Sequence, residues 1–250
     1  MAMRTTILTV RPSPDGDLDV AALDRRGVPA LAAPLMAPSY LDVPRVDSRQ
    51  FGGVIFTSRH AVTGLLAVCG GKPDKMLASC PVFAVGRATA RAARAAGFAD
   101  VTIGHGGGAG LVPLVAAAQD RITGPLLWPA ALHRGFDMVP ALAGIAEVTL
   151  LPVYEMAETT GLPEAVAAAM VAGDILAVIL MSARSARLLR ERLASAGFEQ
   201  AIAGMTLIAG SEGIAAAAGE GWAETYIAKR PTRARLLAIA ALLYDRRTRP

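Results

Sequence analysis

One element occurs twice in the sequence, and this duplication restricts the possible folds more than any other feature. Residues 54–62 read VIFTSRHAV and residues 178–186 read VILMSARSA. In each, a buried apolar strand ends at a serine and runs directly into a helix. An offset of 124 residues aligns the two stretches and holds without gaps over about fifty residues. That period is far too long for a solenoid, so the chain carries two copies of a domain-sized unit.

The aligned positions include turns as well as strands. Ser58 aligns with Ser182, and Gly86 aligns with Gly210. Each copy reads strand, serine turn, helix, strand, glycine turn, helix, strand, loop and helix. The predicted strands are 54–57, 82–85 and 101–103 in the first copy and 177–181, 206–209 and 225–228 in the second. Short apolar strands separated by helices predict parallel βαβ units with right-handed crossovers.

The ends of the two copies predict how they are connected. A strand at 5–10 and a helix at 18–26 precede both copies, and the second copy lacks a leading strand of its own. We therefore predict an α/β fold of two similar parallel-sheet domains, one inserted into the other through a two-stranded linker. The expected parts are a discontinuous domain of residues 1–36 and 157–250, an inserted domain of residues 48–147, and linker strands at 37–47 and 148–156.

Composition and motif spacing exclude several classes of protein. With 53% hydrophobic and 18% charged residues the chain can bury a core. The apolar stretch from Ala165 is broken by Gly173 and Asp174, and the N-terminus lacks a signal-peptide pattern, so we expect a cytoplasmic protein with no membrane partner. Cys69 and Cys80 form no CxxC pair, and the three histidines are scattered, so no metal site and no cofactor are predicted. Aromatic residues make up only 5%, without a basic run, and no nucleic-acid partner is expected.

The kind of basic residue is informative. Arginine supplies 22 of the 25 basic residues, which indicates either codon bias or recognition of carboxylates or phosphates. In open parallel sheets, ligands bind beyond the carboxyl ends of the strands. The serines there are equally well explained as helix N-caps, whereas an arginine in a first helical turn favours a nearby anion. The candidate binding residues at these strand ends are Arg11, Ser58, Arg59, Gly86, Arg87, Arg134, Ser182, Ala183, Arg184, Gly210 and Ser211.

The glycine-rich stretch GHGGGAG, residues 104–110, is a weak phosphate-binding signal. It lacks the GK[ST] of a Walker A motif, and a flexible loop is the simpler interpretation. No nucleophile elbow, Cys–His pair or paired carboxylates are present. Two classes lead: an enzyme that binds an acidic substrate and uses few side chains for chemistry, or a non-catalytic two-lobed binding protein for a small acidic ligand. A nucleotide-binding enzyme, which rests on GHGGGAG alone, ranks last.

Six segments carry a family resemblance over nearly the whole chain: VIFTSRHAV, AVGRATARAARAAGFADV from Ala84, PVYEM from Pro152, VILMSARSARLL, IAGSEGIAAAAGEGW from Ile208 and AKRPTRARLL from Ala228. In order and spacing they resemble uroporphyrinogen-III synthase. The resemblance implies a cofactor-free enzyme of heme biosynthesis that cyclises hydroxymethylbilane with inversion of ring D through a spiro intermediate. It further implies a monomer that has transient contact with hydroxymethylbilane synthase.

The resemblance also assigns roles to particular residues. Tyr154 falls on a family position that faces the cleft and assists loss of hydroxide, with a packing tyrosine as the alternative. Thr89 matches a family threonine at a helix start and either contacts substrate or caps the helix. Thr232, which with Pro231 signals the start of the last helix, is a further candidate binding residue. The chain departs from the family where Arg59 and Ala183 replace a common proline, and where GSEGIA replaces a GPTTA-like turn.

Overall fold

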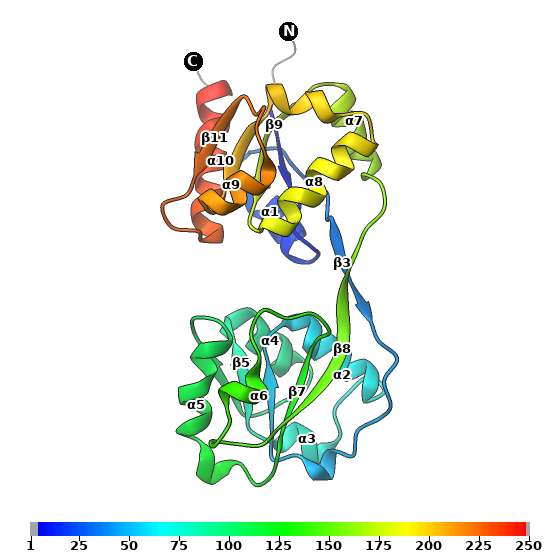
Figure 1. The fold of residues 1–250 in the computed structure, drawn as a ribbon, viewed down its shortest axis with the longest axis vertical. Coiled ribbons are helices and arrows are strands. Elements are labelled where there is room, and N and C mark those ends of the chain that lie inside the picture. The colour runs from blue at the N-terminus through cyan, green and yellow to red at the C-terminus, as the bar shows by residue number, and fades with distance from the viewer. Residues whose placement is uncertain (1–4, 249–250) are drawn as a thin grey trace. The chain divides into compact units, whose positions relative to one another are not determined.

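The computed structural model describes residues 5–248, which form two compact units (Figure 1). Unit 1 comprises the chain up to Ala37 and again from Ala157 onwards, and unit 2 comprises Pro38–Met156. Each unit is built around its own sheet. Both sheets are dominated by parallel strands separated by helices, which confirms the predicted fold class.

The sheet of unit 1 combines segments from both ends of the chain. Its strands are β1 (Thr6–Thr9), β2 (Ala30–Ala32), β9 (Ile175–Leu180), β10 (Thr206–Ala209) and β11 (Glu224–Ile227). They lie in the order β11-β10-β9-β1-β2, and every neighbouring pair is parallel. The N-terminal strand β1 therefore lies inside a sheet whose other long strands come from the second half of the chain.

Helices cover both faces of this sheet. Ile7 and Leu8 are adjacent in β1 and point to opposite faces, as the period of two in a strand requires. Ile7 packs with Leu23 and Leu237 from two helices on one face. Those two helices are α1 (Asp15–Asp24) and α10 (Arg233–Thr248). The helices that pack with Leu8 on the other face are α7 (Glu164–Val171), α8 (Ala183–Ser195) and α9 (Glu212–Ala218).

Unit 2 repeats this architecture. Its strands are β3 (Met36–Tyr40), β4 (Gly53–Phe56), β5 (Val82–Val85), β6 (Val101–Gly104), β7 (Leu126–Ala131) and β8 (Val148–Glu158), in the order β3-β8-β7-β4-β5-β6. Helices α2 (Arg59–Val68), α3 (Lys75–Ser79) and α4 (Gly86–Ala95) cover one face, and α5 (Val112–Ala116) and α6 (Met138–Ala141) the other.

The strand orders confirm the duplication. The run β11-β10-β9-β1 of unit 1 corresponds to β6-β5-β4-β7 of unit 2. Strand β1 thus takes the position that β7 holds in the other sheet, although β1 precedes both copies in the sequence. The second copy needs no strand of its own there because β1 already fills the gap and buries all four of its residues.

The two segments expected to be linker strands take part in the sheet of unit 2. Residues 148–156 lie within β8, where Val148 to Pro152 pair with Leu126 to Ala130 of β7. The pairing covers an edge that β7 would otherwise expose. Upstream, Ala30–Ala32 forms a short strand that pairs with β1. Within residues 5–248, no helix is long and apolar enough to cross a membrane.

Candidate active site

In each unit, the candidate residues lie where strands give way to helices. In unit 2, Ser58 follows β4, Gly86 follows β5 and Arg134 follows β7. Because these strands are parallel neighbours, their carboxyl ends share one edge of the sheet. The same holds in unit 1 for Arg11, Ser182 and Gly210, which follow β1, β9 and β10.

Ser58 caps α2 and also contacts Tyr154. Its Oγ accepts a hydrogen bond from the backbone N–H of His60 at 3.0 Å, so the capping interpretation is confirmed. Tyr154 is only 6% exposed and packs in the core cluster with Val153 and helix α2. Burial raises the pKa of the Tyr154 phenol, and a hydrogen bond with the side chain of Ser58 offsets part of that rise. The phenol is therefore protonated at neutral pH and can donate a hydrogen bond.

His60 lies against Tyr154, and the sequence did not single it out. Its ring centroid lies 5.6 Å from that of Tyr154, with the two planes tilted by 54°. The sequence placed His60 among scattered surface or loop histidines. Its position two residues after the capping serine, in the first turn of α2, was the available signal.

Arg134 is fixed against the edge of the second sheet. Its Nη1 donates to the Leu132 carbonyl at 3.1 Å, and its Nη2 lies 3.6 Å from the Asp137 carboxylate. The guanidinium carbon lies 5.3 Å from the ring centroid of Trp128, within the range of a cation–π contact. The backbone, a carboxylate and an aromatic face therefore hold this arginine at the carboxyl end of β7.

The start of α4 has no side-chain cap. Gly86 begins the helix with a φ of 72°, which favours glycine, and the preceding Val85 cannot cap it. Arg87 is exposed and forms no ion pair within residues 5–248. Thr89 is buried inside the helix, so it does not cap it, and its contact with a substrate stays a prediction. The unpaired amides of this first turn can bind an anion.

The three hydroxyl residues proposed for unit 1 all cap helices. Ser182 Oγ accepts from the Ser185 N–H at 3.0 Å, Ser211 Oγ accepts from the Ile214 N–H at 3.4 Å, and Thr232 Oγ1 accepts from the Arg235 N–H at 3.4 Å. Each cap engages one amide of its first turn and leaves others for a ligand.

Arg184 has a negatively charged partner within unit 1. Ala183 and Arg184 are the first two residues of α8, and the Arg184 guanidinium lies 3.6 Å from the Glu158 carboxylate. A cation at a helix start was taken to favour an outside anion, but here a side chain of unit 1 supplies the negative charge. For Arg59, the first residue of α2, the substrate-binding role stays a prediction.

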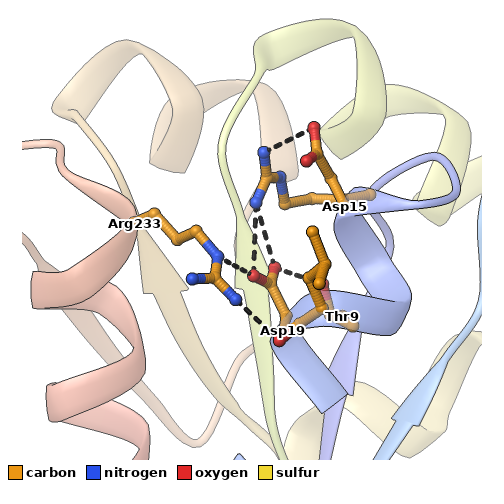
Figure 2. Close-up of polar contacts among 6 residues, drawn as sticks. Thr9, Asp15, Asp19 and Arg233 are labelled. Carbon is orange, nitrogen blue, oxygen red and sulfur yellow. Dashed lines mark hydrogen bonds and ion pairs between the residues drawn. The ribbon is translucent and has the colours of Figure 1, made fainter. Parts of the chain in front are cut away.

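Arg11 belongs to a polar network around the buried Asp19 whose other members are absent from the sequence-based site (Figure 2). Its Nη1 donates to both carboxylate oxygens of Asp19, at 3.2 and 3.3 Å, and its Nη2 lies 2.9 Å from Asp15. Arg233 also contacts Asp19 through its Nε. Asp19 and Arg233 were missed because 214 residues separate them in sequence and no local pattern links them.

The glycine-rich stretch 104–110 serves local packing. A Cβ on Gly110 would lie 1.5 Å from the His105 carbonyl oxygen, and one on Gly108 would lie 2.5 Å from the Phe136 ring. Gly106 and Gly107 adopt positive φ angles of 78° and 79°. The loop closes tightly on itself, which accounts for its glycines without a bound phosphate.

The described residues offer no metal centre, and a sizeable hollow in unit 1 lies away from the candidate residues. Among residues 5–248, no group of three or more His, Cys, Asp or Glu side chains could hold a metal ion. A hollow of about 650 Å³ lies in unit 1, between α8 and residues 158–161. Arg192 lines it and is bound to the Gly161 carbonyl at 3.1 Å, but none of the sequence-predicted site residues does so.

Comparison with known proteins decides the family. The model described as uroporphyrinogen-III synthase HemD matches residues 19–238. The chain belongs to the uroporphyrinogen-III synthase family. This membership confirms the resemblance carried by the six sequence segments, and it makes the chain a member of a family of enzymes.

Solved structures of uroporphyrinogen-III synthases share the fold. The synthetase from Helicobacter pylori is 22% identical with a TM-score of 0.63, and the comparison covers 96% of this chain and all of that one. A mutant synthase from the extremely thermophilic bacterium Thermus thermophilus is 17% identical with a TM-score of 0.53, covering 97% of this chain and 99% of that one. A search of curated protein sequences finds no significant match. At such identities these structures establish the shared fold, while the roles of individual residues stay predictions.

Proposed function

We propose that the protein converts hydroxymethylbilane to uroporphyrinogen III and water. The C–O bond of the ring A hydroxymethyl group breaks, and the oxygen leaves with a proton as water. The resulting azafulvene is attacked by the substituted carbon of ring D, which gives a spiro-pyrrolenine. Fragmentation and reclosure then join ring D in the inverted orientation with loss of a proton. Family membership over residues 19–238 is the observation that carries this proposal.

Tyr154 is proposed to assist the departure of the hydroxyl group. Its raised pKa keeps the phenol protonated, and the Ser58 side chain orients it. A neutral phenol can hydrogen-bond to the leaving oxygen without carrying a charge that repels carboxylates. The pyrroles supply the electrons for each bond that forms, so no protein nucleophile is required.

Substrate binding is proposed to rest on cations and helix-start amides at the carboxyl edges of the two sheets. The bilane carries eight carboxylates, and a planar guanidinium binds a carboxylate through two parallel hydrogen bonds. Arg87 is exposed beside the uncapped start of α4, and the amides left by the caps on Ser182 and Ser211 add donors. These groups are proposed to hold the bilane so that ring D meets the azafulvene through its substituted carbon. Catalysis is then mainly an effect of orientation.

We further propose that the protein acts as a cytoplasmic monomer and receives the unstable bilane by transient contact with hydroxymethylbilane synthase. The alternative, a non-catalytic binding protein for a small acidic ligand, is not favoured by the family match. Product formation distinguishes the enzyme from the binding protein. A binding protein raises its melting temperature with the ligand but yields no product.

The test is turnover of freshly generated hydroxymethylbilane. Products are oxidised to porphyrins and the isomers separated by chromatography, with heat-denatured protein as the control. The bilane closes by itself to isomer I, so the proposal requires isomer III to appear only with folded protein.

A further inference from the structure

Asp19 is the centre of a network that joins both ends of the chain within unit 1. Its side chain is 1% exposed, yet it accepts hydrogen bonds from Thr9 Oγ1 at 3.2 Å, from Arg11 and from Arg233. Figure 2 shows Thr9 and Arg233 both directed at this carboxylate, from β1 and from the start of α10. A carboxylate buried this deeply must be paired, and its partners are thereby fixed in position.

The two arginines on Asp19 differ in what they leave exposed. Arg11 has a side chain 19% exposed, and both of its Nη atoms bind carboxylates, of Asp19 and Asp15. Arg233 is 40% exposed and uses one edge of its guanidinium, with Nε on Asp19 and Nη2 on the Leu18 carbonyl at 2.7 Å. Within residues 5–248, Nη1 of Arg233 makes no hydrogen bond. Arg233 is thus anchored by one edge and open along the other.

Arg233 belongs to a segment that packs near residues already placed at the carboxyl ends of the first sheet. A Cβ on Gly210 would lie 3.6 Å from Pro231 Cβ, so the segment before α10 packs on the turn after β10. Two residues later, Arg233 reaches α1, which follows β1. The strand between β10 and β1 is β9, which ends before Ser182. The segment 231–233 therefore runs between the turn after β10 and helix α1.

We propose that Asp19 is a positioning residue that holds Arg233 as a binding point for one carboxylate of the substrate. Arg11 has Asp15 as a second carboxylate partner, whereas among residues 5–248 the one carboxylate that pairs with Arg233 is Asp19, which it shares with Arg11. A guanidinium already held by two contacts loses little conformational freedom when it binds an anion. This inference deepens the proposed function and rests on it, because the substrate is the source of the carboxylate.

The experiment compares Arg233→Gln with Arg235→Gln, a matched arginine on the same helix outside the Asp19 network. Kinetics use hydroxymethylbilane, and binding uses uroporphyrin III, which has eight carboxylates, in the full-length protein. Arg233→Gln is expected to raise KM and weaken porphyrin binding by about tenfold, the usual effect of losing a hydrogen bond to a charged group, with kcat nearly unchanged. Arg235→Gln should leave KM and porphyrin affinity unchanged.

Two more variants separate positioning from folding. Asp19→Asn is expected to raise KM in the same direction, and Arg233→Lys, which keeps the charge without the fork, should fall between wild type and Arg233→Gln. If Asp19→Asn proves too unstable to purify, the exposed Arg233 variants decide the question. Unchanged KM and unchanged porphyrin affinity in Arg233→Gln overturn the inference. Failure of the proposed function is seen separately, as wild-type protein that yields only isomer I.

Discussion

The imidazole of His60 lies against the phenol of Tyr154, with 5.6 Å between the ring centroids, and Ser58 contacts both residues. Ser58 accepts from the His60 backbone and hydrogen-bonds the side chain of Tyr154, a residue of β8, so the first turn of α2 holds the phenol in place. A buried, oriented and neutral donor is suited to a reaction that begins with loss of hydroxide.

Replacing Tyr154 with Phe tests that role. We expect kcat to fall by about a hundredfold, the lower end of the range for a general acid, because the bilane also loses hydroxide unaided. The ring stays, so the core around Val153 keeps its packing. Tyr226→Phe, at a tyrosine of unit 1 on β11, is the matched control and should be fully active. Wild-type kcat in Tyr154→Phe removes the catalytic role and leaves a packing residue.

The same phenol affects stability at alkaline pH. Its native pKa lies above the ordinary 10.0, so in alkali the unfolded chain loses this proton first and the native state binds more protons. The stabilisation is complete below about pH 10 and declines as pH rises toward the native pKa. Urea unfolding should be measured from pH 8 to 11 for wild type and Tyr154→Phe. The free energy of unfolding of wild type minus that of the variant should be constant at first and then fall as the pH rises. A difference that grows above pH 10 contradicts the raised pKa.

Asp174 should stabilise the junction between β1 and β9. Its Oδ2 accepts from Thr6 Oγ1 at 2.6 Å, and its Oδ1 accepts from Thr5 Oγ1 at 2.9 Å. Burial alone raises the pKa of Asp174, but these hydrogen bonds outweigh it and hold the pKa below the ordinary 3.8. Asp174→Asn should lower the free energy of unfolding at pH 7 by about 1–3 kcal/mol.

Because that pKa is depressed, the contribution of Asp174 is present above about pH 4 and is lost as the pH falls through the native pKa. The gap between wild type and Asp174→Asn in urea unfolding should therefore narrow in acid. Asp120→Asn, at an exposed aspartate, is the control and should change neither the free energy of unfolding at pH 7 nor its dependence on pH. A gap that is constant with pH would show that the carboxylate charge plays no part.

The glycine-rich loop offers a paired test of packing. Gly110→Ala places a methyl group 1.5 Å from the His105 carbonyl oxygen and should cost about 2–3 kcal/mol of stability as the backbone shifts. Gly213→Ala, in α9 with open space around it, should instead stabilise by up to about 1 kcal/mol through helix propensity. Thermal unfolding measures both. Equal stability of the two variants would contradict the tight closure of the loop.

The sequence predicted those parts of the fold and site that depend on neighbouring residues. The strand, serine and helix at Ser58 and Ser182 are local signals, and the structure reproduces both as N-caps. The duplication predicted that β5 and β10 are equivalent, and the sheet orders agree. The second copy lacks a first strand of its own, and this correctly predicted that β1 belongs to its sheet. Without β1, the buried strand β9 would expose one of its edges.

Features that depend on long-range contact were not predictable. Strand β2 has three residues, too few to show a period, and becomes a strand only because β1 offers its edge. Asp19 and Arg233 look like ordinary surface charges of two helices until folding brings them together. The ion pair of Arg184 with Glu158 was likewise not predictable, and the role of Arg184 in substrate binding stays a prediction.

The measurement that tests the central claim most directly is the isomer ratio from fresh hydroxymethylbilane at increasing amounts of wild-type protein. After oxidation and chromatography, the account predicts that isomer III rises with protein until it replaces isomer I. Protein shown to be folded by circular dichroism that gives only isomer I, at every amount, would contradict it.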